Sequence, residues 1–205
     1  MNTSYLIGIA GGSGSGKTTF LRALFDAFAP GELALVSQDN YYHPIEQQQK
    51  DDNGWHNFDL PESIDRGHFF EDITALQSGN SIEKLEYTFN NDAARPERIL
   101  IEPAPVLITE GLFVFHYDEI NTMLDYRVYF DADRNERLRR RIYRDDKERG
   151  YPEHEVRYQW ENHVIPAEEK FLLPHKQQAD LVIDNTKTFE RDLDRLVSHI
   201  QSILS

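Results

Sequence analysis

The sequence predicts an α/β fold with a parallel, doubly wound sheet, on three observations. Short apolar segments alternate with segments of helical periodicity along the chain. A glycine-rich segment lies between the first apolar segment and the first helical one. The 205 residues include no cysteine and are 39% hydrophobic, so a packed core must stabilise the fold without disulfides. Because no linker or repeat divides the chain, we expect one domain over residues 1–205.

The expected elements follow from the pattern of apolar side chains. Aliphatic runs predict strands at residues 4–10, 33–37, 106–109, 126–130 and 181–183. Helical periodicity predicts helices at residues 17–28, 66–77, 134–149, 153–171 and 189–204. In the first helix, Phe20, Leu24 and Phe28 fall on one face. Ligands of such sheets bind at the carboxyl ends of the strands.

A β-hairpin is expected between the second and third strands of the core. Residues 81–89 and 98–102 have the pattern of its two strands, so the insertion spans residues 81–102. We expect this hairpin to form one wall of a substrate pocket.

The glycine-rich segment GGSGSGKT matches the P-loop pattern G-x-x-x-x-G-K-[ST]. Without Cβ atoms, the backbone can turn successive N–H groups toward phosphate oxygens, and the positive end of the next helix faces the same anion. The segment predicts a P-loop NTPase-type fold that binds ATP. Lys17 would contact the β and γ phosphates, and the Thr18 hydroxyl would bind Mg²⁺. The expected ATP-binding residues are Gly11, Gly12, Ser13, Gly14, Ser15, Gly16, Lys17, Thr18 and Thr19.

Two other nucleotide-binding classes do not fit the sequence. No G-x-G-x-x-G register runs through these glycines, which argues against a dinucleotide-binding fold. The chain contains no Asn-Lys-x-Asp motif, and its Asp-x-x-Gly at residues 51–54 follows a polar loop, so a GTPase is not expected.

Two acidic residues follow predicted strands at the same edge of the sheet. Asp39, in SQDNYY, would face the γ-phosphate and could take the proton from an acceptor hydroxyl. A turn or cap role is the alternative, because Asp-Asn pairs favour turns. Glu110 could hold Mg²⁺ directly or through water.

Basic residues are concentrated in one helical segment of an acidic chain. The chain has 22 basic and 36 acidic residues, a net charge of −14, which disfavours binding to a nucleic-acid polymer. Eight of the 22 basic residues lie in residues 134–149. A solvated, salt-bridged face is the ordinary interpretation. However, Arg137, Arg141 and Arg144 share one face, and cations accelerate phosphoryl transfer. We therefore expect an arginine-rich helical lid over residues 134–165.

Taken in their order along the chain, the motifs of this sequence resemble those of the uridine/cytidine kinases in the phosphoribulokinase and uridine kinase superfamily. The resemblance covers most of the chain and rests on GGSGSGKT, SQDNYY, NFDLPESID, the hairpin that begins at Tyr87, ITEGLFVF and RRRIYRDDKERG. It implies phosphorylation of the 5′-hydroxyl of uridine or cytidine to UMP or CMP in pyrimidine salvage, with ATP and Mg²⁺. It also implies a homo-oligomer, either a tetramer or a dimer.

The resemblance assigns roles to particular residues. Asp39 matches the general base, and Glu110 the acid that acts with Thr18 on Mg²⁺. Lys17, Arg144 and Arg149 match groups near the phosphates. The implied substrate-binding residues are Phe58, Asp59, Tyr87, Phe89, Arg141 and Gln159. The aromatic members of that set could equally belong to the core.

Three departures from the family pattern keep the acceptor open. Asp92 replaces a hairpin histidine, Tyr151 replaces an arginine, and Asp184-Asn185-Thr186 replaces Pro-Arg-Gly. One alternative is therefore a related kinase for another hydroxylated metabolite, such as a different nucleoside, pantothenate or a phosphosugar. A non-catalytic ATP-binding regulator is a further alternative, although it would not need Asp39, Glu110 and Arg144 together.

The remaining residues suggest no other chemistry. Eight histidines lack metal-binding spacing, and only His43 and His56 lie near the expected acceptor loop. The longest apolar run, residues 5–10, is too short for a membrane span or a signal peptide. We expect a cytoplasmic protein with no membrane partner.

Overall fold

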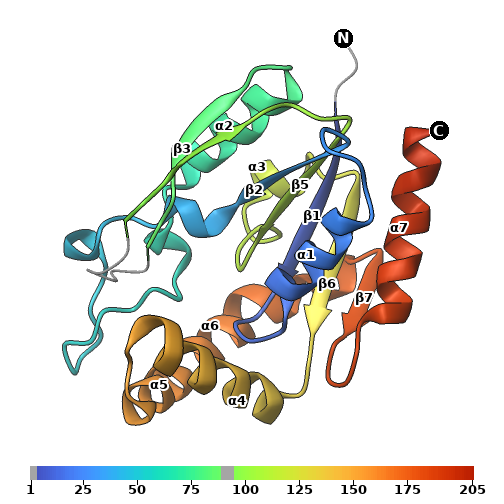
Figure 1. Ribbon diagram of the computed structural model, residues 1–205. Coiled ribbons are helices and arrows are strands. Elements are labelled where there is room, and N and C mark those ends of the chain that lie inside the picture. Colours follow the sequence, from blue (N-terminus) through green and yellow to red (C-terminus); the bar gives the residue numbers. More distant parts are fainter. Residues whose placement is uncertain (1–3, 89–94) are drawn as a thin grey trace.

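The computed structural model describes residues 4–88 and 95–205 (Figure 1). Its main sheet has five strands in the order β2-β5-β1-β6-β7, and all neighbouring strands are parallel. The strands are β1 (Tyr5–Gly11), β2 (Leu33–Ser37), β5 (Val106–Gly111), β6 (Tyr126–Asp131) and β7 (Leu181–Asp184). The predicted parallel sheet is confirmed, and each strand lies within one or two residues of its expected bounds.

Helices cover both faces of this sheet, as expected for a doubly wound fold. The helices are α1 (Lys17–Asp26), α2 (Arg66–Gln77), α3 (Asp118–Asn121), α4 (Arg134–Arg144), α5 (Glu153–Gln159), α6 (Ile165–Ala167) and α7 (Glu190–Leu204). Side chains of α1 and α7 form one core with Ile7 and Ile9 of β1. Side chains of α2 and α3 form the other with Leu6 and Ala10. Alternate residues of β1 thus serve two cores, which explains its continuous apolar run.

Two predicted helices differ in detail from the observed ones. The first ends at Asp26, so Phe28 lies beyond α1, although it still packs against the core. The helix expected over residues 153–171 contains two π-helical turns, Trp160–Val164 and Glu168–Leu172, on either side of α6. Pro166 lies between these turns and lacks the N–H that a regular α-helical ladder requires.

The arginine-rich helix is also divided. Helix α4 ends at Arg144 and continues as a π-helical turn, Asp145–Arg149. Gly150, at φ 72°, ends this turn in the left-handed conformation that glycine adopts readily. The wider turn changes the direction of the side chains that follow α4.

The predicted hairpin is present as β3 (Ile82–Leu85) and β4 (Arg98–Ile101), which pair antiparallel, although β3 ends at Leu85, before the end expected for the first strand at residue 89. The ammonium of Lys84 lies 3.6 Å from the centre of the Tyr41 ring and 3.4 Å from Asp72 Oδ2. These contacts fasten the hairpin to α2 and to the segment that follows β2. Phe89 and Asp92, for which the sequence suggests roles, lie outside the described residues.

The carboxyl ends of the strands point toward α4, α5 and α6 (Figure 1). The functional residues expected from the sequence therefore gather at this end of the sheet. None of the helices in the described part of the chain is both long and apolar enough to cross a membrane.

Candidate functional site: a P-loop cleft beneath an arginine-rich lid

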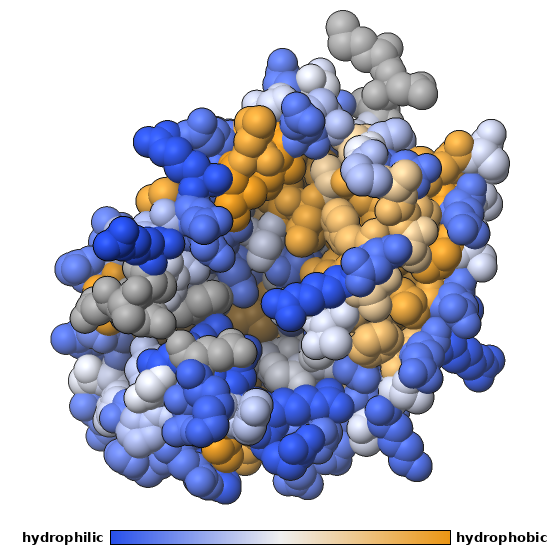
Figure 2. All heavy atoms as spheres, viewed as in Figure 1, coloured by the Kyte–Doolittle hydropathy of each residue, from blue (hydrophilic) through white to orange (hydrophobic). Residues whose placement is uncertain are grey.

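A cleft of about 920 Å³ lies between the P-loop, the segment after β2, the hairpin and the lid. Figure 2 shows the molecule hollowed on this face, with a mostly hydrophilic surface below the hollow. The lining includes most of the site residues expected from the sequence. They are Ser13, Gly14, Ser15, Gly16, Lys17, Thr18, Thr19, Asp39, Phe58, Asp59, Tyr87, Glu110, Arg141, Arg144, Arg149 and Gln159.

The P-loop has the curled backbone that its sequence predicts. Gly14 and Gly16 adopt φ values of 74° and 100°, in the left-handed region where side chains are strained. The Lys17 ammonium donates to the Gly11 carbonyl at 2.7 Å. Ser15 Oγ is buried without a hydrogen-bond partner among the described residues. A polar atom left without a partner in such a loop fits an anion such as a phosphate.

Residues from the far end of the chain support this loop from behind. Arg137 Nε donates to the Ser13 carbonyl at 3.0 Å, and Asn185 Nδ2 donates to the Ser15 carbonyl at 2.8 Å. Arg137 also pairs with the buried Glu168. A Cβ atom on Gly12 would lie 1.9 Å from Arg137, which explains the need for glycine there.

These contacts correct the expected position of Arg137. Its side chain is 2% exposed and lies against the rear of the loop, where Gly11 and Gly12 are also buried. Of the three arginines expected on one catalytic face, Arg141 and Arg144 line the cleft and Arg137 does not. The helical spacing placed them on one face, but the P-loop packs against Arg137 at the amino-terminal end of that face.

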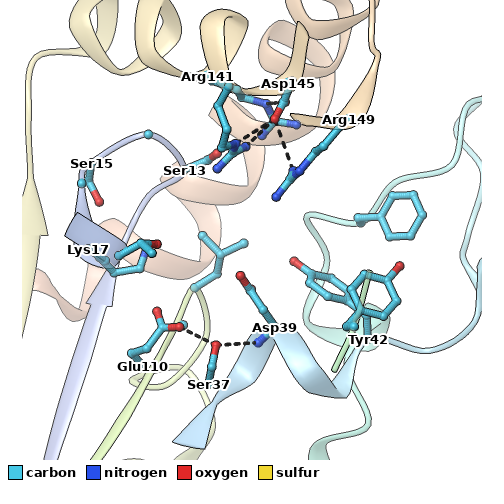
Figure 3. A pocket seen from close by; sticks show the side chains of 18 of the residues that line it. Ser13, Ser15, Lys17, Ser37, Asp39, Tyr42, Glu110, Arg141, Asp145 and Arg149 are labelled. Carbon is cyan, nitrogen blue, oxygen red and sulfur yellow. Dashed lines mark hydrogen bonds and ion pairs between the residues drawn. The ribbon is translucent and has the colours of Figure 1, made fainter. Parts of the chain in front are cut away.

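Asp39 and Glu110 lie at the ends of neighbouring strands and share a hydroxyl. Asp39 lies in a 3₁₀-helical turn, Gln38–Tyr41, directly after β2. Ser37 pairs in register with Glu110 across the two strands, and its hydroxyl donates to Glu110 Oε1 at 2.5 Å. The same hydroxyl accepts from the Asp39 backbone N–H at 3.3 Å. In Figure 3 the Asp39 side chain extends into the cleft between Glu110 and the arginines of the lid.

Electrostatics at this edge of the sheet oppose charging of both Glu110 and Lys17. Burial and the nearby Asp39 carboxylate raise the pKa of Glu110 to about 7, although Lys17 and Ser37 act in the opposite direction. Burial lowers the pKa of Lys17, and the two carboxylates only partly compensate. An arriving phosphate and a divalent cation would supply the opposite charges that these two groups lack.

The residues present fit a magnesium ion that is held mainly by the nucleotide. Thr18 is exposed on the cleft and Glu110 lines the same wall. Within the described ranges, no cluster of three or more histidine or acidic residues could hold a metal by itself. Mg²⁺ commonly uses one or two protein ligands together with phosphates and water.

Asp145 binds three of the arginines of the lid. Its carboxylate is 1% exposed and lies 3.2 Å from Arg141 Nε, 2.8 Å from Arg144 Nη2 and 3.3 Å from Arg149 Nη1. Figure 3 shows Arg141 and Arg149 beside Asp145 above the cleft. Burial and the neighbouring Arg144 lower the pKa of Arg149, so these cations lie in an environment that favours an added anion.

Aromatic side chains form the opposite wall. The Tyr42 ring lies 5.2 Å from the Tyr87 ring and 6.0 Å from the Phe58 ring, measured between centroids. The Tyr87 backbone N–H donates to Asn40 Oδ1 at 3.1 Å, which ties the hairpin to the segment that carries Asp39. Asp59 lies next to Phe58 and is buried at 8% exposure.

Tyr42, Asp145 and His163 line the cleft but are missing from the set expected from the sequence. Tyr42 lies in the motif SQDNYY together with Asp39, and Asp145 lies in RRRIYRDDKERG directly after Arg144. Their places in these motifs could have indicated that they line the cleft. His163 also lines the cleft, whereas the two histidines expected nearest to it were His43 and His56, of which His56 does line it. The spacing of Gln159 and His163, one helical turn apart, could have indicated this.

The loop, the acidic pair and the arginine-rich lid define a P-loop enzyme that transfers phosphoryl groups. Residues 6–191 match the model of the phosphoribulokinase / uridine kinase family, and the chain belongs to this family. It is 34% identical over 205 residues to a uridine kinase of Staphylococcus epidermidis, covering 100% of this chain and 99% of the relative. It is also 34% identical over 204 residues to a uridine kinase of Brevibacillus brevis, covering 100% and 95%.

The solved structure of phosphoribulokinase from Rhodobacter spheroides has the same fold. The TM-score is 0.66 at 14% identity, over 90% of this chain and 71% of the other. At this identity the likeness concerns the fold alone.

Proposed function

We propose that this enzyme transfers the γ-phosphoryl group of ATP to the 5′-hydroxyl of a pyrimidine nucleoside, uridine or cytidine. The observation that carries the proposal is that Asp39 and the P-loop line one cleft, whose other wall is aromatic and includes a buried carboxylate, Asp59. An aromatic wall can stack on a base, and a carboxylate can accept from vicinal sugar hydroxyls. The full-length similarity to uridine kinases supports this acceptor.

In this proposal each group of the cleft has one task. The P-loop amides and Lys17 bind the phosphates, while Thr18 and Glu110 would hold Mg²⁺, which neutralises charge on the phosphates when bound. Asp39 accepts the proton of the 5′-hydroxyl as that oxygen attacks phosphorus. Arg144 and Arg149 stabilise the charge on the transferred group. We propose that residues 1–205 act as one kinase unit; the homo-oligomer stays a prediction.

A second candidate is a kinase for a different alcohol. Tyr151, where the family pattern has an arginine, lines the cleft and changes its polarity. A non-catalytic ATP-binding regulator is less well supported, because Asp39, Glu110 and Arg144 line the same cleft and binding alone does not need all three.

A screen for acceptor-dependent ADP release distinguishes these candidates. The purified protein with MgATP is offered uridine, cytidine, purine nucleosides, pantothenate and phosphosugars separately. We expect release with uridine or cytidine only. Release with another alcohol alone would favour the second candidate, and ATP binding without release for any acceptor would favour the regulator.

A further inference from the structure

A carboxylate–imidazole pair lies on the lid side of the cleft, apart from the groups assigned to phosphoryl transfer. His163 lies in the π-helical turn Trp160–Val164, and its side chain is 2% exposed. Its Nε2 atom lies 2.8 Å from Asp51 Oδ2, and its ring lines the cleft. Asp51 belongs to the loop before Phe58, so the pair joins this loop to the lid.

Asp51 is held firmly in its ionised form. Its Oδ1 atom accepts from the backbone N–H groups of Asn53 and Trp55, each at 2.9 Å. The Tyr158 hydroxyl donates to Oδ2 at 2.7 Å. Burial acts to raise the pKa of Asp51, but the hydrogen bonds from Tyr158, His163 and the backbone N–H groups of Trp55 and Asn53 together outweigh it and hold the pKa well below its usual range.

This environment determines which nitrogen of His163 carries the proton. An ionised carboxylate can only accept, so the Nε2 atom of His163 must be the donor. In the neutral ring, Nδ1 then bears a lone pair. Among the described residues, no hydrogen bond engages Nδ1. The carboxylate therefore orients the ring and leaves one acceptor atom for a ligand, as carboxylates do for functional histidines elsewhere.

The neighbouring polar groups complement a hydroxylated ligand. Gln159 lies one helical turn before His163, and its Oε1 accepts from Arg141 at 2.9 Å, which leaves its NH₂ group as a donor. The buried Asp59 carboxylate lines the same cleft as an acceptor. Two acceptors and one donor match the hydroxyl groups of a sugar, each of which can donate and accept.

We propose that His163 is a specificity-determining residue that accepts a hydrogen bond through Nδ1 from a sugar hydroxyl of the phosphate acceptor. Asp51 is its positioning residue. This inference rests on the proposed function, because it takes the acceptor to be a nucleoside. It assigns His163 no part in the transfer of the phosphoryl group.

The first test separates acceptor binding from nucleotide binding. One neutral hydrogen bond is worth roughly a tenfold change in binding at most. We therefore expect His163→Phe to raise the KM for the nucleoside about tenfold and to leave the KM for ATP unchanged. His154→Phe, at an exposed position of α5, is the matched control and should change neither KM. An unchanged nucleoside KM in His163→Phe would overturn the inference.

Deoxynucleosides identify the hydroxyl. For the wild-type enzyme, removing the 2′- or the 3′-hydroxyl should raise KM, and for the hydroxyl that His163 contacts this increase should vanish in His163→Phe. If both deoxy analogues weaken binding to the two enzymes equally, His163 contacts neither hydroxyl and the inference is wrong.

Nitrogen-15 NMR of the imidazole in the wild-type protein tests the geometry without an activity assay and without a variant that must fold. Adding the nucleoside to the wild-type protein should shift the Nδ1 resonance of His163 and leave Nε2 nearly unchanged. In Asp51→Asn, the amide can donate to Nε2, so the spectrum should show the proton on Nδ1 and the nucleoside KM should rise. If the Nδ1 resonance of His163 does not shift when the nucleoside binds, the inference is wrong.

The proposed function fails in a different way. If the wild-type enzyme phosphorylates no nucleoside in the acceptor screen, the proposed function is wrong and the sugar ligand of His163 with it. If nucleosides are phosphorylated and His163→Phe behaves like wild type, only the inference falls.

Discussion

Asp39 and Glu110 are connected through the side-chain hydroxyl of Ser37, yet the tasks proposed for them differ. Ser37 donates to Glu110 and accepts from the backbone of Asp39, so one hydroxyl connects the two acidic residues. The carboxylate of Asp39 is left to the cleft, whereas one oxygen of Glu110 is engaged. Replacing each carboxylate by the amide of the same shape therefore tests the two proposed roles separately.

Asp39→Asn should retain ATP binding and lose turnover by about 10²-fold or more, the loss expected when a general base is removed. Equilibrium titration with ATP and steady-state rates with the identified acceptor measure the two effects. Asp26→Asn, at the exposed end of α1, is the control and should keep both. Normal turnover of Asp39→Asn would show that Asp39 is not the base.

Glu110→Gln should stabilise the fold while lowering the Mg²⁺-dependent rate. Because the pKa of Glu110 is raised to about 7 in the folded protein, its protonated form favours folding, and this stability is lost as the pH rises from about 4.5 through 7. Glutamine does not ionise, so the Glu110→Gln variant does not lose this stability as the pH rises. The difference in the free energy of unfolding between Glu110→Gln and the wild type should therefore grow across that range, toward a limit of about 3–4 kcal/mol at pH 8, from roughly 1.4 kcal/mol per pKa unit.

Urea unfolding at pH 5 and pH 8 measures this difference, with the exposed Glu71→Gln as control. An equal effect at both pH values would mean that Glu110 is not the group that loses stability on ionisation.

At the scale of elements, the π-helical turn after α4 determines how the lid presents its charges. Because Asp145 begins this turn, one buried carboxylate reaches arginines from α4 and from the turn itself. The lid thus holds these cations together through their shared contact with Asp145.

Asp145→Asn should lower the free energy of unfolding by about 2 kcal/mol and reduce turnover. Breaking a buried ion pair costs roughly 3–5 kcal/mol, and the partial exposure of Arg144 reduces this figure. Thermal unfolding and steady-state rates provide the measurement. The adjacent Asp146 pairs with Lys147 on the surface and is 56% exposed, so Asp146→Asn should change neither quantity. Equal behaviour of the two variants would contradict the role given to Asp145.

At the scale of the whole molecule, the cleft brings Lys17 together with the lid arginines Arg141, Arg144 and Arg149 in a chain of net charge −14. The P-loop, the lid and the segment after β2 come from distant parts of the chain and meet only at the carboxyl edge of the sheet. A bound nucleotide should therefore stabilise the folded state as a unit, because unfolding separates all its contacts.

MgATP at 100 times its Kd should raise stability by about 2.7 kcal/mol, which for a chain of this size raises Tm by roughly 5–10 °C. Differential scanning fluorimetry measures the shift. Lys17→Met removes the cation at the centre of the loop, so most of the Tm shift caused by MgATP should disappear in this variant. If MgATP leaves the Tm of the wild-type protein unchanged, the protein does not bind ATP.

The sequence by itself determined the parallel sheet, the hairpin, the P-loop and the positions of Asp39 and Glu110 after their strands. These features depend on local patterns: the periodicity of apolar residues, the backbone freedom of glycine and the order of motifs along the chain. The end of each apolar run marks the end of a strand, and the carboxyl ends of parallel strands lie at a common edge of the sheet. Residues that follow different strands can therefore be placed near one another from the sequence.

Only the tertiary structure decided which side chains meet. Arg137 and Arg141 occupy equivalent positions on one helical face, yet Arg137 lies behind the P-loop and Arg141 lines the cleft. Asp51 and His163 are 112 residues apart, and no local pattern relates them. Helical spacing assigns a face, but the neighbour packed against each turn of that face follows from the arrangement of the whole chain.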